Sequence, residues 1–302
     1  MDEDWSKGAA WMAGGVVPIA EAKIHVTDWA LTRSDVTYDV VPVREGGFFR
    51  LNDYLDRFEA SMAALRLDTG VGRAEMKAAL HAIVAKAGLK NAYVSMTAAR
   101  GVPLVPGTRD PRQCGNHFYA WAVPYIHVVT PEVVARGAKL WIAKTVRRIP
   151  EDSVNPRAKN YHWGDLTAGL FEAVDAGFDT VALLDHAGNV TEGPGFNVFA
   201  MKNGRVTTSG HGVLHGLTRR TVLEMCAETG IETEERPLPL EELLESDEVF
   251  LSTSGGGVVP IVQVGDRFFG NGAPGPGATG LASLYWNWTK RPEWREEISY
   301  AA

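Results

Sequence analysis

Lys159 is a residue whose type and setting could do covalent chemistry. It follows a proline-containing turn and precedes a segment in which Leu166, Leu170 and Val174 have helical spacing. A lysine amine that is locally deprotonated can form a Schiff base with an aldehyde. A lone lysine in such a place is usually an ordinary surface cation, so a catalytic role for Lys159 has to be supported by residues elsewhere in the chain.

Glu192 offers a carboxylate in a tight turn. The stretch TEGPGFN, residues 191–197, places it among glycine and proline between two expected strands. Such a turn would aim the side chain inward instead of leaving it in solvent. The alternative is that Glu192 has no role beyond the local structure of this turn.

Two other stretches suit a phosphate. Gly216, Leu217 and Thr218 open an expected helix, where free backbone N–H groups and the positive end of the dipole favour an anion. The stretch STSGG, residues 252–256, combines hydroxyls with close backbone approach at the end of an expected strand. The alternative interpretation is that Thr218 is only a helix cap and that the run of glycines is only a flexible turn. A lysine, a buried carboxylate that keeps a ring nitrogen protonated and a two-sided phosphate cup are together what pyridoxal 5′-phosphate requires.

Composition limits the class of protein. The chain has 302 residues, 45% of them hydrophobic and 22% charged, which is typical of a globular protein of about two domains. A net charge of −7 argues against a general nucleic-acid binder, and no apolar run reaches the ~20 residues that cross a membrane. Cys114 and Cys226 give neither a disulfide framework nor metal-ligand spacing, so we expect no metal. The N-terminus is acidic where a signal peptide would be basic, which predicts a cytoplasmic protein.

Mixed strand and helix patterns in both halves predict an α/β fold, or an α+β mixture. We expect a small N-terminal α/β domain over residues 1–127, a connection over 128–137 and a larger C-terminal domain over 138–302. A helix capped by Asn52 or Asp53 should carry Arg57, and residues 101–116 should form a mobile loop. The other expected elements are helices over 73–87 and 218–229, and strands over 16–26, 31–43, 91–99, 117–123, 139–146, 180–185, 196–202 and 248–252.

The order of the candidate stretches resembles one enzyme family. Lys159 begins KNYHWGDL, Glu192 begins EGPGFN, and LTR at 217–219 and TSGG at 253–256 follow. This series resembles the fold-type IV pyridoxal-phosphate-dependent transaminases, which include branched-chain aminotransferases, D-amino acid aminotransferases, (R)-selective amine transaminases and aminodeoxychorismate lyases. The resemblance runs from about Val16 to Trp286. The stretches that look most like the (R)-amine branch are residues 34–40, 49–51 and 56–59.

The resemblance implies a role for each matching residue. Lys159 would hold pyridoxal 5′-phosphate as a Schiff base and then move the substrate proton, and Glu192 would pair with the ring nitrogen. The phosphate would be held by Arg57, Leu217, Thr218 and Ser254, with Thr253 adjacent, and the substrate pocket would be lined by Tyr38, Val40 and Gly256. The implied fold is a small α/β domain joined to a larger pseudo-barrel α/β domain with the cofactor between them. The implied assembly is a homodimer with active sites near the subunit interface.

One departure from the family pattern concerns substrate choice. D-amino acid and many (R)-amine enzymes carry an arginine in the loop after a strand-end Arg-Gly, whereas here Arg100-Gly101 is followed by VPLVPG. Arg109 and Arg112 lie just beyond, and Arg33 stands where relatives often have histidine. A guanidinium at any of these three positions could bind a substrate carboxylate bidentately, and each also suits a solvated loop.

The resulting expectation is a transaminase. It would move an amino group from an (R)-amine or a D-alanine-like donor to a keto acid or ketone by way of Lys159. The alternatives are a branched-chain or D-amino acid aminotransferase and an aminodeoxychorismate lyase. A non-catalytic protein that keeps the scaffold is disfavoured because no essential position is missing. The expected partners are small-molecule amines and keto acids, with no nucleic acid and no membrane.

Overall fold

The computed structural model describes residues 4–300, which divide into two compact units, each described by itself. Unit 1 holds the described residues up to Ile126, the short segment Ala158–Tyr161 and the described residues from Thr289 onward. Unit 2 holds His127–Arg157 and His162–Trp288. The predicted domains also include residues 1–3 and 301–302, which lie outside the described residues.

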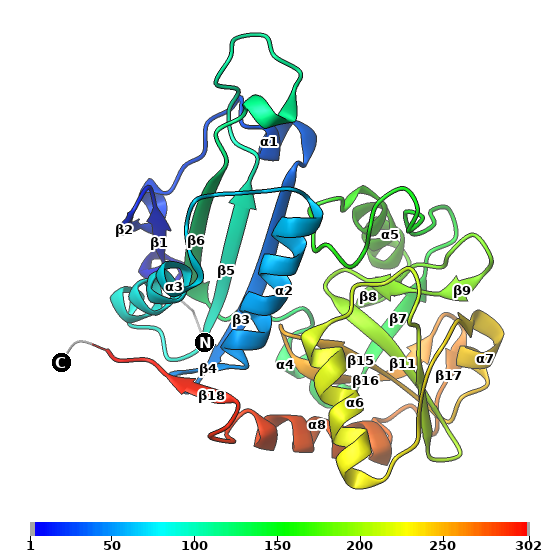
Figure 1. Ribbon diagram of the computed structural model, residues 1–302. Helices are drawn as coiled ribbons and strands as arrows, with labels where there is room; N and C mark the ends of the chain where they lie inside the picture. The colour runs from blue at the N-terminus through cyan, green and yellow to red at the C-terminus, as the bar shows by residue number, and fades with distance from the viewer. Residues whose placement is uncertain (1–3, 301–302) are drawn as a thin grey trace. The chain divides into compact units, whose positions relative to one another are not determined.

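Unit 1 is built on an antiparallel sheet of seven strands in the order β18-β4-β3-β5-β6-β1-β2 (Figure 1). Strands β3 and β5 pair from Val36↔Ala99 to Val43↔Ala92. Helix α2 packs on β3, and α3 packs on β6 and β1. The elements of unit 1 are η1 Trp5–Lys7, β1 Ala9–Met12, β2 Gly15–Pro18, η2 Ile19–Glu21, α1 Trp29–Arg33, β3 Val36–Arg44, β4 Gly47–Phe49, α2 Leu51–Ala64, α3 Arg73–Ala87, β5 Ala92–Ala99, η3 Pro111–Gln113, β6 His117–Pro124 and β18 Arg295–Glu297.

The core of unit 1 follows from helical spacing. Leu55 and Phe58 of α2 and Leu80 and Ile83 of α3 recur three residues apart and are fully buried. Gly88 ends α3 with φ 67°, a left-handed value that glycine adopts without strain. The predicted helix over 73–87 is therefore confirmed to the residue.

Unit 2 is built on a nine-stranded mixed sheet (Figure 1). Its main path is β13-β12-β11-β15-β16-β7-β8, with β10 paired to β11 and β17 paired to β16, and a separate two-stranded sheet joins β14 to β9. The elements of unit 2 are α4 Pro131–Arg136, β7 Ala138–Ile142, α5 Gly164–Asp175, β8 Thr180–Ala182, β9 Asn189–Val190, β10 Glu192–Gly193, β11 Phe196–Lys202, β12 Arg205–Thr208, α6 Leu217–Thr229, β13 Thr233–Glu235, β14 Leu238–Pro239, α7 Leu240–Leu244, β15 Glu248–Thr253, β16 Gly257–Val264, β17 Arg267–Phe268 and α8 Pro276–Trp288.

Helix α5 buries the first part of the apolar stripe that its sequence predicts, since Leu166 and Leu170 pack in one core cluster, but not the end of that stripe. Leu166 is buried, as expected, but Val174 is 67% exposed. The buried side continues through Gly169 and Ala173 instead. A Cβ on Gly169 would lie 2.9 Å from the Leu183 side chain, so the small residues let α5 approach the strand region closely.

Several predicted elements are wrong in extent. The predicted strand over 16–26 ends at Pro18, and residues 31–33 of the predicted strand over 31–43 belong to α1. The N-cap position of α2 is Arg50 and not Asn52 or Asp53, and no side chain makes a capping hydrogen bond there. The Asp53 carboxylate accepts a hydrogen bond from Arg50 Nε at 2.6 Å. The expected connection over 128–137 contains α4, and the expected loop over 101–116 contains η3. Within residues 4–300, no helix is long and apolar enough to cross a membrane.

The two units also divide the chain differently from the predicted domains. Residues Ala158–Tyr161 and the residues after Trp288 were expected in the C-terminal domain. They group with unit 1 because Asn160 forms a β-bridge with Thr37 and because β18 pairs with β4. The predicted domain boundaries stay predictions.

Candidate active site

Lys159 lies on a segment that is fixed to β3 and α2. Its carbonyl oxygen accepts hydrogen bonds from the Thr37 hydroxyl at 2.6 Å and from the Tyr38 N–H at 3.4 Å. Its own N–H donates to the Ser61 hydroxyl at 3.3 Å. The Lys159 Nζ lies 4.5 Å from the centre of the Tyr38 ring. Both sides of the main chain are thus held, which limits where the half-buried amine can go.

Tyr38 and Val40 lie on the same face of β3, since side chains two apart in a strand share a face. Both are buried. The Tyr38 ring stacks on the Tyr161 ring with 4.1 Å between centres and 14° between planes. The structure therefore brings the predicted pocket residues Tyr38 and Val40 together, with Lys159 beside the first of them.

Arg57 of α2 pairs with Asp39 of β3. The Arg57 Nε donates to one Asp39 oxygen at 2.8 Å and Nη2 donates to the other at 2.6 Å. Burial lowers the pKa of Arg57, but the charge and hydrogen bonds of Asp39 outweigh burial, and the pKa is raised overall. Arg57 is therefore a permanent cation in a fixed orientation. Its predicted phosphate contact would use donors other than the two that Asp39 accepts.

Glu192 sits in a hairpin formed by β10 and β11, joined by Pro194 and Gly195. Gly195 has φ 83°, the value that a type II turn requires after proline. A Cβ on Gly193 would come within 2.2 Å of the Val181 carbonyl oxygen, so glycine alone fits beside the carboxylate. The turn directs the Glu192 side chain inward, where that side chain is 9% exposed.

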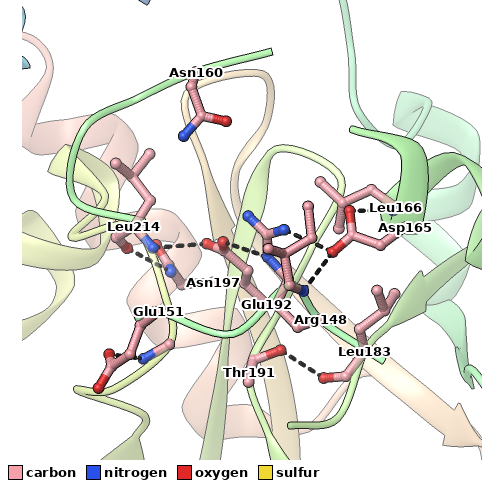
Figure 2. Close-up of polar contacts among 12 residues, drawn as sticks. Arg148, Glu151, Asn160, Asp165, Leu166, Leu183, Thr191, Glu192, Asn197 and Leu214 are labelled. Atoms are coloured by element: carbon pink, nitrogen blue, oxygen red, sulfur yellow. Dashed lines mark hydrogen bonds and ion pairs between the residues drawn. The ribbon is translucent and has the colours of Figure 1, made fainter. Parts of the chain in front are cut away.

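The Glu192 carboxylate is held by two donors from distant parts of unit 2 (Figure 2). Arg148 Nε donates to Oε1 at 3.1 Å, and the Leu214 N–H donates to Oε2 at 2.9 Å. Arg148 Nη1 also donates to Asp165 at 2.7 Å, so one guanidinium joins two buried carboxylates. Burial lowers the pKa of Arg148, but the charge of Glu192 and the contacts with Asp165 outweigh burial and raise the pKa overall.

Asn197 fixes the same loop from the other side. Its amide donates to the Leu214 carbonyl oxygen at 2.9 Å, while Glu192 accepts from the Leu214 N–H (Figure 2). The Leu214 main chain is thus held by hydrogen bonds at both its N–H and its carbonyl oxygen. A Cβ on Gly216 would lie only 2.3 Å from Asn197 Oδ1, which explains the glycine just before α6.

The start of α6 has the character of an anion site. Gly216 precedes Leu217 and has no side chain to cap the first N–H groups. Thr218 is 3% exposed, and its hydroxyl has no hydrogen-bond partner among the described residues. Burying a polar atom without a hydrogen-bond partner costs free energy, so this hydroxyl indicates that a ligand binds at the start of the helix.

Thr253 is the last residue of β15, and Ser254 and Gly256 follow it. The Thr253 hydroxyl donates to the Gly195 carbonyl oxygen at 2.7 Å and accepts from the Gly255 N–H at 3.1 Å. Thr253 therefore ties this turn to the Glu192 hairpin. Ser254 is half-buried and Gly256 is buried in the turn that leads to β16.

The three candidate carboxylate-binding arginines of unit 1 have different settings. Arg33 is exposed, and its guanidinium carbon lies 3.4 Å from the centre of the Trp29 ring. Arg112 pairs with Asp110 at 2.6 Å and is 78% exposed. Arg109 is exposed in the loop before η3. Their roles stay predictions.

Sequence reasoning missed three residues of this site, namely Arg148, Asp165 and Asn197. Arg148 follows the strand predicted over 139–146, and an arginine at a buried strand end is a signal. Arg147 precedes it, however, and the pair alone does not show which of the two turns inward.

The donors in unit 2 fit pyridoxal 5′-phosphate. Arg148, Asp165 and Glu192 leave one negative charge in a buried cluster, which a protonated ring nitrogen would balance. The unpartnered Thr218 hydroxyl at the start of α6 suits the phosphate. In unit 1, Lys159 supplies the amine and Arg57 a fixed cation.

A mixed α/β chain with these groups fits the class of pyridoxal-phosphate-dependent enzymes. The model of the family described as Amino-transferase class IV matches residues 37–264, and the chain belongs to this family.

Individual relatives agree with this membership. A putative branched-chain-amino-acid aminotransferase of Methanocaldococcus jannaschii is 30% identical over 264 residues, covering 86% of this chain and 89% of that protein. D-alanine aminotransferase of Bacillus licheniformis is 26% identical over 273 residues, covering 87% and 90% respectively. The crystal structure of a T.th. branched-chain amino acid aminotransferase complexed with N-(5′-phosphopyridoxyl)-L-glutamate matches with a TM-score of 0.88 at 27% identity, covering 97% of this chain and 99% of that one.

These findings confirm three predictions. The fold class is the mixed α/β fold of the class IV aminotransferases, the protein is an aminotransferase, and its cofactor is pyridoxal 5′-phosphate, on which this class depends. The roles of individual residues stay predictions.

Proposed function

We propose that the protein transfers an amino group from an (R)-amine or a D-alanine-like donor to a keto acid or ketone. The observation that carries this proposal is the buried Glu192 carboxylate, held by Arg148 at 3.1 Å in a buried cluster with Asp165. A carboxylate held in this way can keep a cationic ring nitrogen in place, which amino-group transfer requires.

Each residue has a defined task. When bound, pyridoxal 5′-phosphate supplies an aldehyde for the amine and a ring that accepts electrons from the substrate carbon. Lys159 would hold the cofactor through its Nζ and would move the proton of the substrate carbon. Glu192 holds the proton on the ring nitrogen. The Thr218 hydroxyl and the first N–H groups of α6 would bind the phosphate, and the family resemblance also assigns a phosphate contact to Arg57, Ser254 and Thr253.

Donor choice is supported by residues 34–40, 49–51 and 56–59, which resemble the (R)-amine branch. The lack of an arginine directly after Gly101 is a departure from that branch, so another group has to bind a substrate carboxylate. Arg112 is engaged by Asp110 in a bidentate contact, so it is a poor candidate for a substrate carboxylate. Arg109 and Arg33 are the candidates for the carboxylate of the acceptor. Tyr38, Val40 and Gly256 are assigned to the donor pocket.

The alternative is a branched-chain or D-amino acid aminotransferase. The names of the relatives from Methanocaldococcus jannaschii and Bacillus licheniformis support it. Aminodeoxychorismate lyase is a weaker alternative.

The test is an absorbance titration of the cofactor-loaded protein with (R)- and (S)-1-phenylethylamine, D-alanine and L-leucine separately. Bleaching by the (R)-amine or D-alanine is expected, and bleaching by L-leucine alone would refute the proposed donor class. Pyruvate release from aminodeoxychorismate without an acceptor would indicate the lyase. Lys159→Ala should abolish turnover, and full activity in that variant would sink the mechanism.

We also propose that the chain acts as a homodimer, as the family resemblance implies, and that it works in the cytoplasm, as its two cysteines without a disulfide framework suggest. Sedimentation equilibrium and cell fractionation test these two points. A monomer that keeps full activity would contradict the first.

A further inference from the structure

Arg148 is a buried cation shared between two buried carboxylates of unit 2. Arg148, Asp165 and Glu192 are 9%, 8% and 7% exposed. The guanidinium uses Nε toward Glu192 at 3.1 Å and Nη1 toward Asp165 at 2.7 Å, as Figure 2 shows. The Arg148 N–H donates to the Leu184 carbonyl oxygen at 2.9 Å, so its main chain is fixed as well.

Asp165 is the better-supported carboxylate of the two. Besides Arg148, it accepts hydrogen bonds from the Ile149 N–H at 2.8 Å and from the Leu166 N–H at 2.8 Å. It also lies in the first turn of α5, where the helix dipole stabilises a negative charge. Glu192 accepts its second hydrogen bond from the Leu214 N–H, at 2.9 Å.

This asymmetry decides what happens without the arginine. Two carboxylates that share a site cannot both stay ionised once their cation is gone, so one takes a proton. Asp165 keeps two backbone donors and the helix dipole, which favour its ionised form, so we expect the proton on Glu192. A neutral Glu192 can no longer hold a cation on the cofactor ring.

We propose that Arg148, oriented by Asp165, is the positioning residue that keeps Glu192 ionised and aimed at the ring nitrogen of the cofactor. This role depends on the proposed function of Glu192. A guanidinium suits the task because its planar fork reaches two carboxylates at once, which a lysine ammonium does with less geometric control.

The experiment measures two properties of protein loaded with pyridoxal 5′-phosphate. One is the dissociation constant of the cofactor, and the other is the NMR signal of a cofactor labelled at the ring nitrogen, which reports its proton. Arg148→Gln should weaken binding about tenfold to a hundredfold, the effect of one lost hydrogen bond to a charged group, and should lose the ring proton.

The decisive variant is the double change Arg148→Gln with Asp165→Asn. It removes the competing carboxylate and restores the single negative charge of the cluster, so Glu192 should ionise again and most of the ring proton and affinity should return. A purely structural ion pair predicts that the double variant is at least as impaired as Arg148→Gln. That outcome would overturn the proposal, as would an Arg148→Gln protein with unchanged affinity and ring proton.

Two controls separate folding from function. Arg100→Gln removes an equally buried arginine, its side chain 9% exposed against 10% for that of Arg148, from its ion pair with Asp35 in unit 1. It should lower stability and leave the ring proton in place. If Arg148→Gln does not fold, Arg148→Lys serves in its place, since it keeps the cation and should keep the ring proton with a smaller loss of affinity. Loss of the ring proton in Arg148→Lys would contradict the proposal.

Glu192→Gln distinguishes the two levels of inference. If this variant keeps the ring proton and the affinity, the proposed role of Glu192 fails and the role of Arg148 fails with it. If Glu192→Gln loses both while Arg148→Gln loses neither, the role of Arg148 alone is refuted.

Discussion

Gly216 is a position where a single added methyl group should harm the cofactor site. Its backbone, φ −59° and ψ 140°, is open to any residue, so alanine meets no conformational strain there. The obstacle is Asn197 Oδ1, 2.3 Å from the position of a new Cβ. A normal carbon–oxygen contact is about 3.3 Å or more, so one side must move by roughly 1 Å.

Neither side can move freely. Asn197 donates to the Leu214 carbonyl oxygen at 2.9 Å, and Leu214 donates to Glu192 at 2.9 Å. Relief of the clash therefore breaks a hydrogen bond or shifts the start of α6. Overpacking of this kind destabilises a protein by about 1–3 kcal/mol. We expect a fall in Tm of a few degrees and about a tenfold loss of affinity for pyridoxal 5′-phosphate.

Gly72 provides a matched control for Gly216→Ala. It is also the glycine before a helix, α3, without a side-chain cap, and a Cβ there meets nothing within 4 Å. Gly72→Ala should lower Tm less than Gly216→Ala and leave cofactor affinity unchanged. Differential scanning calorimetry and fluorescence titration check both variants. Equal effects of the two changes would refute the reasoning from the Asn197 contact.

Three further predictions concern other contacts. Thr218→Val removes a buried hydroxyl without a described partner, so the apo-protein should be at least as stable in thermal melts while cofactor affinity falls about tenfold; unchanged affinity would exclude Thr218 from the phosphate site. Asp39→Asn leaves Arg57 buried without its anion and should lower the free energy of unfolding by ~3 kcal/mol or more in urea titrations, and a loss below ~1 kcal/mol would mean that the pair is dispensable. Burial raises the pKa of Glu172, but hydrogen bonds from Lys144 and its neighbours outweigh it and lower the pKa to about 2. The depressed pKa means that stability from Glu172 is present above pH 4.5 and is lost as the pH falls toward 2, so Glu172→Gln should be less stable than the parent at neutral pH and converge with it in acid. A constant difference across that pH range would contradict this.

The sequence predicts well those helices and strands whose signals lie within the same stretch of residues. The helix over 73–87 was predicted to the residue because helical spacing and a terminal glycine are contained in that stretch. The strand over 196–202 was likewise confirmed because it follows a Pro-Gly turn. In α5 the predicted stripe holds for Leu166 and Leu170 and fails at Val174, because the small residue Gly169, which lies against Leu183 just after β8, turns the buried side away from Val174.

The parts that the sequence could not supply depend on contacts between distant residues. Arg148 and Glu192 are 44 residues apart, and nothing near either one names the other. Thr37 and Lys159 are 122 residues apart, so the hydrogen bond that fixes the lysine segment is invisible in the local pattern. The candidate site could be assembled from motifs, whereas the groups that orient its members required the fold.

The two hydrogen bonds of Leu214 are both made by its main chain, and this has a consequence for the freedom of that position. Its N–H reaches Glu192 and its carbonyl oxygen accepts from Asn197 whatever side chain it carries. Substitution at 214 should therefore be tolerated widely, with proline excluded because it has no N–H to donate. Two hydrogen bonds that the proposed cofactor site needs are therefore made at a position where many residue types would serve.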